Sequence, residues 1–424
     1  MGRATGLPRA LLAVSAAVLT LTLAACGNTA SNPDWPSQQQ GALPSATTEQ
    51  LKTAVTDAIT LSGGSAALVG VWAPWAGSWT AAIGTTTRGG SVPVSPAMTF
   101  RAGQLTTAMT CTVLLQLVDD GTVELDDPLT KWVPGLVGAS GVTLRELCQN
   151  TSGIGDYAAA LRTEFLANPE RYWPPLELAS DGIATARTGN PGEKYDPSQT
   201  NAILLGMALQ NATGRNWQQL YQSYVFGRLG MSASVLPEDT VLTVPGPHPA
   251  GYAAALDPTG APVCDQTHDI TALSPSMGWT AAGVVSNVAD LKAFAQALAS
   301  GSLLTSGSAD AQAKTVGAGA SWLGYGLGVQ VVGPLRGGAG AVPGYLSAMY
   351  ADPSSGLTIV VALNDSTPGA GFAQSLAERL ASIVSKVPAA QKGAKVVASL
   401  PWSEDQAAAA MKASAPCPTK PAAG

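Results

Sequence analysis

Charged side chains are scarce in this sequence. Lys, Arg, Asp and Glu make up 12% of its 424 residues, about half of the roughly 25% that is usual in globular proteins. The net charge is -6, and the chain contains no run of basic residues. The charge pattern therefore argues against a nucleic-acid partner, because binding to phosphates depends on clustered Lys and Arg.

Histidine is also rare. The two histidines, His248 and His268, stand in unrelated loops, so a histidine-rich metal site is implausible. We expect neither a metal nor a cofactor. The apolar share of 46% is nevertheless large enough for a sizeable core, and the length fits two or three domains or a single large one.

The first 25 residues predict a signal peptide. Arg3 and Arg9 form a basic region, and residues 10–23 form a short apolar one. The segment Leu23-Ala24-Ala25-Cys26 resembles a bacterial lipobox, in which the cysteine receives a diacylglyceryl group. We expect export and attachment to the outer face of the bacterial cell membrane through lipid on Cys26. An ordinary secretory signal or an uncleaved anchor are alternatives, but the apolar run is short for a span of roughly 20 residues.

The other four cysteines become possible disulfide partners in an exported protein. They are Cys111, Cys148, Cys264 and Cys417. Four cysteines allow three pairings, and their spacing does not choose between them. Cys111 and Cys148 fall in apolar helical contexts, so they could equally be buried free thiols.

Composition divides the remaining chain into three parts. Residues 26–46 are rich in Pro, Ser, Gln and Asn and predict a tether between membrane and domain. Residues 47–387 form the predicted domain. Residues 388–424 are rich in Ala and Pro and predict a tail that holds one short helix at most.

The domain shows both helical and strand patterns. Thr47 and Gln50 suit a capping box that opens a first helix, and Ser286 suits the N-cap of a later one. Residues 105–118 are apolar nearly all round, which predicts a helix buried at the centre of the domain. Strands are predicted at residues 66–72, 79–83, 325–332, 346–351 and 357–364. A final helical stripe comprises Phe372, Leu376, Leu380, Ile383 and Val387.

The most specific signal lies between Met98 and Leu136. Phe100, Arg101 and Gly103 lead into the buried helix, and Leu125-Asp126-Asp127-Pro128 follows it after a turn at Gly121. This frame resembles the active-site segment of the serine beta-lactamase, DD-peptidase and esterase family, of the class C beta-lactamase type. The resemblance covers about residues 50–387. It implies an α+β fold of the α/β sandwich type, in which N- and C-terminal helices flank an antiparallel sheet and a mostly helical subdomain is inserted at about 105–265.

The family's first catalytic motif is Ser-x-x-Lys, which places a nucleophile and a base on one face of the helix. Here the two positions hold Gln104 and Thr107. A carboxamide is a poor nucleophile, and a threonine hydroxyl is no base near neutral pH. The main-chain N–H of Gln104 could still serve as half of an oxyanion hole.

The other two motifs are substituted as well. The family's Tyr-x-Asn corresponds to Pro197 and Gln199, and proline removes both the phenol and a main-chain donor. The family's Lys-Thr-Gly or His-x-Gly corresponds to Gly338-Ala339-Gly340, where Gly338 replaces a cation. Three substitutions inside well-matched flanks indicate that the family chemistry has been lost.

Other side chains could restore a nucleophile, but a capping or loop role suits each better. These are Thr106, Thr107, Ser152, and Ser198 with Lys194. Asp126, Asp127 and Asp290 match frame positions of the family and suit structural caps or turns.

We therefore predict a non-catalytic envelope lipoprotein that binds or scaffolds a ligand at the former active site. The residues expected to line that cleft are Gln104, Thr107, Asn150, Ser198, Gln199 and Ala339. A cleft without its charges suits a neutral peptide, a glycan segment or an envelope protein. The alternative is an active esterase, DD-peptidase or beta-lactamase-like hydrolase with an unidentified nucleophile. A Ser or Thr hydroxyl beside a base in the cleft would favour that alternative.

Overall fold

An antiparallel sheet of eight strands forms the centre of the computed structural model, which describes residues 1–2 and 35–417. The strand order is β2-β1-β12-β11-β10-β9-β8-β7. The strands are β1 (Ala66–Ala73), β2 (Gly77–Gly84), β7 (Val316–Gly317), β8 (Leu323–Tyr325), β9 (Gln330–Val332), β10 (Leu335–Val342), β11 (Tyr345–Ala351) and β12 (Thr358–Leu363). Because β1 pairs with β12, the two ends of the domain meet in one sheet.

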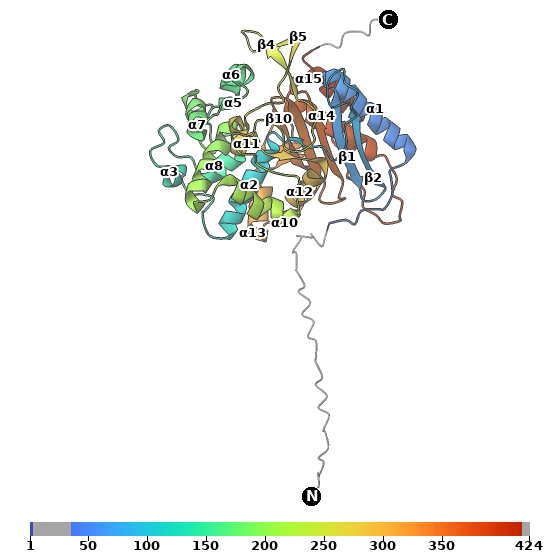
Figure 1. Cartoon of the computed structure of the whole chain (residues 1–424), viewed down its shortest axis with the longest axis horizontal. Coiled ribbons are helices and arrows are strands. Elements are labelled where there is room, and N and C mark those ends of the chain that lie inside the picture. Colours follow the sequence, from blue (N-terminus) through green and yellow to red (C-terminus); the bar gives the residue numbers. More distant parts are fainter. Residues whose placement is uncertain (3–34, 418–424) are drawn as a thin grey trace.

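Helices cover both faces of this sheet (Figure 1). On one face lie α1 (Ser45–Ser62), α14 (Ala370–Val384) and α15 (Glu404–Ser414), which share a core with alternate residues of β1 such as Val69 and Val71. The other face packs against α12 (Val288–Ser300) and the helical part of the molecule, through residues such as Leu68. The central strands β1, β11 and β12 thus contribute alternate residues to two cores, because successive side chains point to opposite sides.

The helical part lies between β2 and β7 in the chain. Its helices are α2 (Leu105–Asp119), α3 (Leu129–Trp132), α4 (Leu144–Gln149), α5 (Tyr157–Ala160), α6 (Arg162–Ala167), α7 (Pro175–Ala184), α8 (Gln199–Thr213), α9 (Trp217–Tyr221), α10 (Gly227–Leu229), α11 (Trp279–Ala282) and α13 (Ser306–Ala313). Two short ribbons complete it: β3 (Phe100–Arg101) with β6 (Val285–Ser286), and β4 (Tyr252–Leu256) with β5 (Pro262–Asp269). The arrangement is the α+β fold that the sequence predicts.

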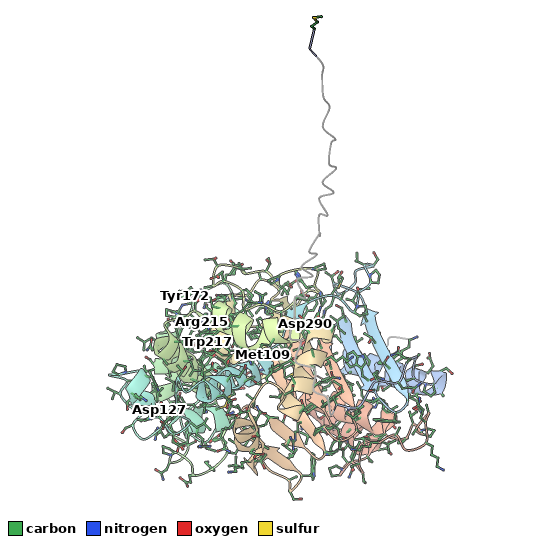
Figure 2. All side chains as sticks on the ribbon, turned by 90° about the horizontal axis from the view of Figure 1, so that it is seen from below. Met109, Asp127, Tyr172, Arg215, Trp217 and Asp290 are labelled. Carbon is green, nitrogen blue, oxygen red and sulfur yellow. A yellow bond between two sulfur atoms is a disulfide. The ribbon has the colours of Figure 1, made fainter. Side chains whose placement is uncertain are left out.

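Helix α2 occupies the centre of the molecule. Figure 2 labels Met109 on this helix, which lies between the other helices and the sheet. Nearly all of its residues are buried, as expected of a helix without a polar face. Its first turn is thereby held rigidly against the end of β10.

Several local predictions were wrong. Helix α1 begins at Ser45 with Pro44 at its N-cap, so the capping box of Thr47 and Gln50 does not form. Helix α12 is capped by Asn287, whose side chain accepts from the N–H of Asp290, while Ser286 lies in β6. The strand predicted at 325–332 is the hairpin of β8 and β9, because the chain turns at Gly328 with a positive φ of 71°.

The second half of the predicted tether lies on the domain. The Gln38 amide donates to the carbonyls of Ala73 and Gly77, and Leu43 is buried. Residues 3–34 lie outside the described residues. They include the predicted signal peptide after its first two residues, Cys26 and the first part of the predicted tether. No helix in the described part of the chain is long and apolar enough to cross a membrane.

The predicted tail also packs against the domain. Its helix, α15, is opened by a capping box of Ser403 and Gln406. Trp402 and Met411 are buried in the core that includes α14. Only residues 418–424 of this segment lie outside the described residues.

All four cysteines of the described domain form disulfides. Cys111 is bonded to Cys148, which joins α2 to α4 inside the core, so the alternative of free thiols there is wrong. Cys264 of β5 is bonded to Cys417, beyond the end of α15.

Candidate binding cleft

The start of α2 and the end of β10 border a cavity of about 430 Å³, here called the first cavity. All six residues predicted for the cleft line it, as do Pro197 and Gly338. Gly340 lies just beside it, where a Cβ atom would stand 2.5 Å from the main-chain nitrogen of Gln104. A glycine there therefore lets β10 approach the helix start closely.

Gln104 is directed across the cleft. It stands at the N-cap position of α2, and its side-chain Oε1 accepts a hydrogen bond from the main-chain N–H of Ala341. Strand β9 pairs with β10 only from Leu335 to Gly337, so this N–H has no strand partner on that side. The carboxamide of Gln104 thus occupies a main-chain donor at the edge of the cleft.

The threonines of the first turn are engaged elsewhere. The Thr107 hydroxyl donates to the carbonyl of Ala281 at 3.0 Å. The Thr106 hydroxyl is fully buried and accepts from the N–H of Val284 at 3.1 Å. Neither contact provides a base, so neither hydroxyl is activated as a nucleophile.

The residues of the second motif hold the opposite wall together. Asn150, in the left-handed region at φ 55°, accepts from the N–H of Ser198 at 3.2 Å and from the Asn201 amide at 2.9 Å. The Ser198 hydroxyl donates to the carbonyl of Gly155 at 2.9 Å, and that of Ser152 donates to the Asn201 side chain. These contacts give the polar groups structural roles.

Lys194 does not contact the Ser198 hydroxyl. Its ammonium group instead lies 3.7 Å from the carboxylate of Asp196, and the lysine is exposed. The pair of Ser198 and Lys194 therefore does not form.

Sequence reasoning missed several residues of this wall. The rings of Tyr195 and Tyr325 lie 5.0 Å apart, and burial raises the pKa of Tyr195 to about 12. Burial also raises the pKa of Asp156, whose Oδ1 accepts from the N–H groups of Gln199 and Ala158. Tyr195 stands within the second motif and could have been found there, whereas Tyr325 comes from a distant strand.

A second cavity of about 430 Å³ adjoins the first, with Gln104, Gln199 and Ala341 lining both. Its walls are mainly apolar. They include Tyr157, Phe165, Leu166, Met277, Val342 and Pro343. No sequence motif indicated this cavity, because widely separated segments of the chain contribute its walls.

The hydroxyls of the second cavity bond mostly to the main chain. Ser366 accepts from the N–H of Gly344, and Ser414 donates to the carbonyl of Ala410. Thr367 likewise bonds to the main chain, since its hydroxyl accepts from the N–H of Ala254 at 2.9 Å, while its own main-chain N–H donates to the carboxylate of Asp365 at 2.8 Å. Burial raises the pKa of Asp365, and the contacts with Thr367 and Arg88 oppose that rise.

The three frame aspartates have structural partners. Asp126 pairs with Arg145, and Asp127 accepts from Lys131 and the Trp132 indole. Asp290, labelled in Figure 2, accepts from the N–H of Ala233 and the hydroxyl of Ser234. Within residues 35–417, no group of three or more His, Cys, Asp and Glu could hold a metal ion.

Two curated relatives are hydrolases by name. The D-aminopeptidase of Gluconobacter oxydans (strain 621H) is 33% identical over 151 residues, which cover 35% of this chain and 28% of that protein. The D-alanyl-D-alanine-carboxypeptidase/endopeptidase AmpH of Escherichia coli (strain K12) is 31% identical over 193 residues, covering 43% of this chain and 46% of that protein. The chain thus spans less than half the length of these relatives.

Solved structures share the fold over most of the chain. A D-stereospecific amidohydrolase from Streptomyces sp. superposes with a TM-score of 0.65 at 27% identity, covering 76% of this chain and 94% of that one. A D-amino acid amidase from Ochrobactrum anthropi SV3 superposes with a TM-score of 0.68 at 23% identity, covering 80% and 99%. A family model described as beta-lactamase matches residues 58–383. The chain therefore belongs to the beta-lactamase family of serine-hydrolase-related proteins, as its motif frame predicts.

Proposed function

We propose that this protein is an exported, lipid-anchored and non-catalytic member of its family that binds a ligand in the former active-site cleft. One observation carries the proposal: the Gln104 carboxamide stands in place of the nucleophile and hydrogen bonds to the N–H of Ala341. Acyl transfer needs a nucleophile and a base at this point, and neither is present.

The groups that would assist a nucleophile are also replaced. Thr107 is bonded to a main-chain carbonyl, and Pro197 has no ionisable group. Gly338 carries no cation. A Cβ atom at this position would lie 3.6 Å from its nearest neighbour, the Leu105 side chain, so the glycine leaves space there. The cleft retains volume and polar main-chain groups without the means of covalent catalysis.

The ligand that suits this cleft best is a neutral extended peptide. The N–H of Ala341 faces the cleft, and peptide groups two residues apart in a strand face the same side, so those of Ala339 face it as well. A peptide could add to this strand edge through main-chain hydrogen bonds once the Gln104 side chain releases the N–H of Ala341. The described residues that line the first cavity include one carboxyl group, Asp156, and no cation.

The names of similar proteins favour a small amide or peptide over the glycan or protein ligand that the sequence left open. Solved neighbours include a D-amino acid amidase in complex with L-phenylalanine amide. A curated relative is named a D-alanyl-D-alanine-carboxypeptidase/endopeptidase. We therefore choose N-acetyl-D-Ala-D-Ala-amide and its L,L isomer as probes.

One observation favours the alternative of an active hydrolase. Thr367 lines the second cavity with its hydroxyl group, and its main-chain N–H donates to the buried carboxylate of Asp365 at 2.8 Å. Against this, the same hydroxyl accepts from the N–H of Ala254 at 2.9 Å, and Asp365 is paired with Arg88. These contacts suit a turn better than a nucleophile and its base.

Two measurements test the proposal. Intact-mass analysis after incubation with a fluorophosphonate, and separately with a penicillin, should show no adduct on the folded soluble domain. Calorimetry with the two peptide amides should show reversible binding without hydrolysis. An adduct that peptide mapping places on one residue, Thr367 included, would overturn the non-catalytic proposal.

Membrane attachment has its own support and test. The disulfides Cys111–Cys148 and Cys264–Cys417 fit an oxidising compartment outside the cytoplasm. In a bacterial host, wild-type protein should fractionate with membranes and Cys26→Ser should not. Equal membrane association of the two would contradict lipidation at Cys26.

A further inference from the structure

Residues 414–417, here called the strap, run from the last residue of α15 to a cysteine that is bonded to the hairpin of β4 and β5. Helix α15 is anchored on the domain through buried Ala407 and Met411. Just beyond the end of this helix, Cys417 is bonded to Cys264 of β5. Figure 1 shows α15 ending near the hairpin of β4 and β5, although these segments are far apart in the sequence.

The strap forms part of the second cavity. Ser414 and Pro416 line it, together with Ala253, Ala254 and Pro262 of the hairpin to which the strap is bonded. The carbonyl of Pro416 lies 3.8 Å from the sulfur of Cys264, so the strap lies against the hairpin at this point. Without the bond to Cys417, this wall would depend on the end of α15 alone.

The lining indicates what this cavity would hold. It is mainly aromatic and aliphatic. Among the described residues that line it, Arg162 is the charged one, and this side chain is exposed. Burial of methylene groups is favourable in such a cavity, whereas an unpaired charge there is costly. The cavity adjoins the first one at Gln104 and Ala341, which places it next to the same edge of β10.

We propose that the second cavity binds a compact uncharged apolar group of the ligand, such as a short acyl chain or an aromatic side chain, and that the strap limits the size of that group. This inference rests on the proposed function, because the same ligand would hold its amide at the edge of β10. The Cys264–Cys417 bond fixes the wall that sets the limit.

A series of N-acyl-glycinamides tests the size limit. Acetyl, butanoyl, hexanoyl, octanoyl and dodecanoyl members would be titrated into the oxidised domain by calorimetry. Affinity should rise about fourfold per methylene while the chain fits, and fall for the dodecanoyl member. A rise that continues to dodecanoyl, or no dependence on chain length, would overturn the proposal.

Two matched variants remove the disulfide that holds the strap, one by replacing each of its cysteines. Cys264→Ser and Cys417→Ser should each bind the dodecanoyl probe about fifteenfold more tightly than wild type, as expected for two more buried methylenes at about fourfold each. Ser414→Leu should act in the opposite direction and move the optimum to a shorter chain with the disulfide intact. Thermal unfolding checks that each variant is folded, and unchanged chain-length preference in all three contradicts a limiting strap.

The acetyl member separates this inference from the proposed function. It has almost no tail, so it should bind wild type and the strap variants equally. If the acetyl member binds all variants equally and the chain-length preference is the same in wild type and the strap variants, only the size limit is refuted. No binding of the acetyl probe or of the two peptide amides refutes the proposed function, and the inference with it.

Discussion

The side-chain oxygen of Gln104 accepts a hydrogen bond from the main-chain N–H of Ala341, 237 residues away in the sequence. The contact joins the first turn of the central helix to the end of β10, on the side that β9 leaves unpaired. It satisfies a donor that a ligand amide would otherwise use, and it holds the side chain between the two cavities. A ligand that bound at this edge would therefore compete with an internal amide.

Removal of that amide should strengthen ligand binding. In Gln104→Ala the N–H of Ala341 is free to donate to a ligand carbonyl, and one hydrogen bond of about 1 kcal/mol corresponds to about fivefold in affinity. Calorimetry with N-acetyl-D-Ala-D-Ala-amide measures the change. Gln199→Ala is the matched control, since Gln199 also lines both cavities but has no contact with Ala341. Equal effects of the two variants would show that added volume, not the freed donor, is responsible.

Restoring the first motif should restore acylation without efficient turnover. Gln104→Ser/Thr107→Lys supplies a nucleophile and a base one turn apart, and it frees the N–H of Ala341 as an oxyanion donor. Pro197 and Gly338 still lack the phenol and the cation of the other motifs. We expect a stable fluorophosphonate adduct by intact mass and little hydrolysis of a chromogenic ester. Full hydrolytic activity would show that the other two positions are dispensable.

Asp156 should make stability depend on pH in mild acid. Burial raises its pKa in the folded state above the unfolded value of about 3.9, so the folded protein takes up this proton first as the pH falls. Wild type should therefore gain stability relative to Asp156→Asn between neutral pH and about 4, and the difference should level off below it. Urea unfolding across this range measures the difference.

Asp126→Asn provides the opposite trend as a control. Arg145 lowers the pKa of the Asp126 carboxyl. Wild type should therefore be more stable to urea than Asp126→Asn at neutral pH, and this difference should be lost as the pH falls through the folded-state pKa. If the difference in stability from wild type changed with pH in the same direction for both variants, the role given to burial of Asp156 would be contradicted.

Loss of the internal disulfide should destabilise the whole domain. The Cys111–Cys148 bond closes a loop across a separation of 37 residues, which corresponds to about 3–4 kcal/mol of unfolding free energy. Cys111→Ala/Cys148→Ala should lower the urea midpoint accordingly without shifting the chain-length preference for acyl-glycinamides. A variant as stable as wild type would show that the buried core around these two cysteines suffices without the bond.

The sequence by itself determined the family, the α+β fold and the position of the central helix. It also determined that Gln104 and Thr107 stand one helical turn apart at the start of that helix. The residues expected in the cleft from the family resemblance all line the first cavity, although they come from four separate segments of the chain. Local boundaries were less well determined, as at Ser286 and Asn287, because neighbouring polar residues can each cap a helix and packing selects between them.

Only the tertiary structure decided how distant segments meet. The contact of Gln104 with Ala341, the contact of the Tyr195 and Tyr325 rings and the pairing of Cys264 with Cys417 each join residues that no local pattern connects. The second cavity likewise depends on the packing of the tail against the domain. Such contacts follow from burial of side chains from many segments at once, and a linear pattern records only the tendency of each segment to be buried.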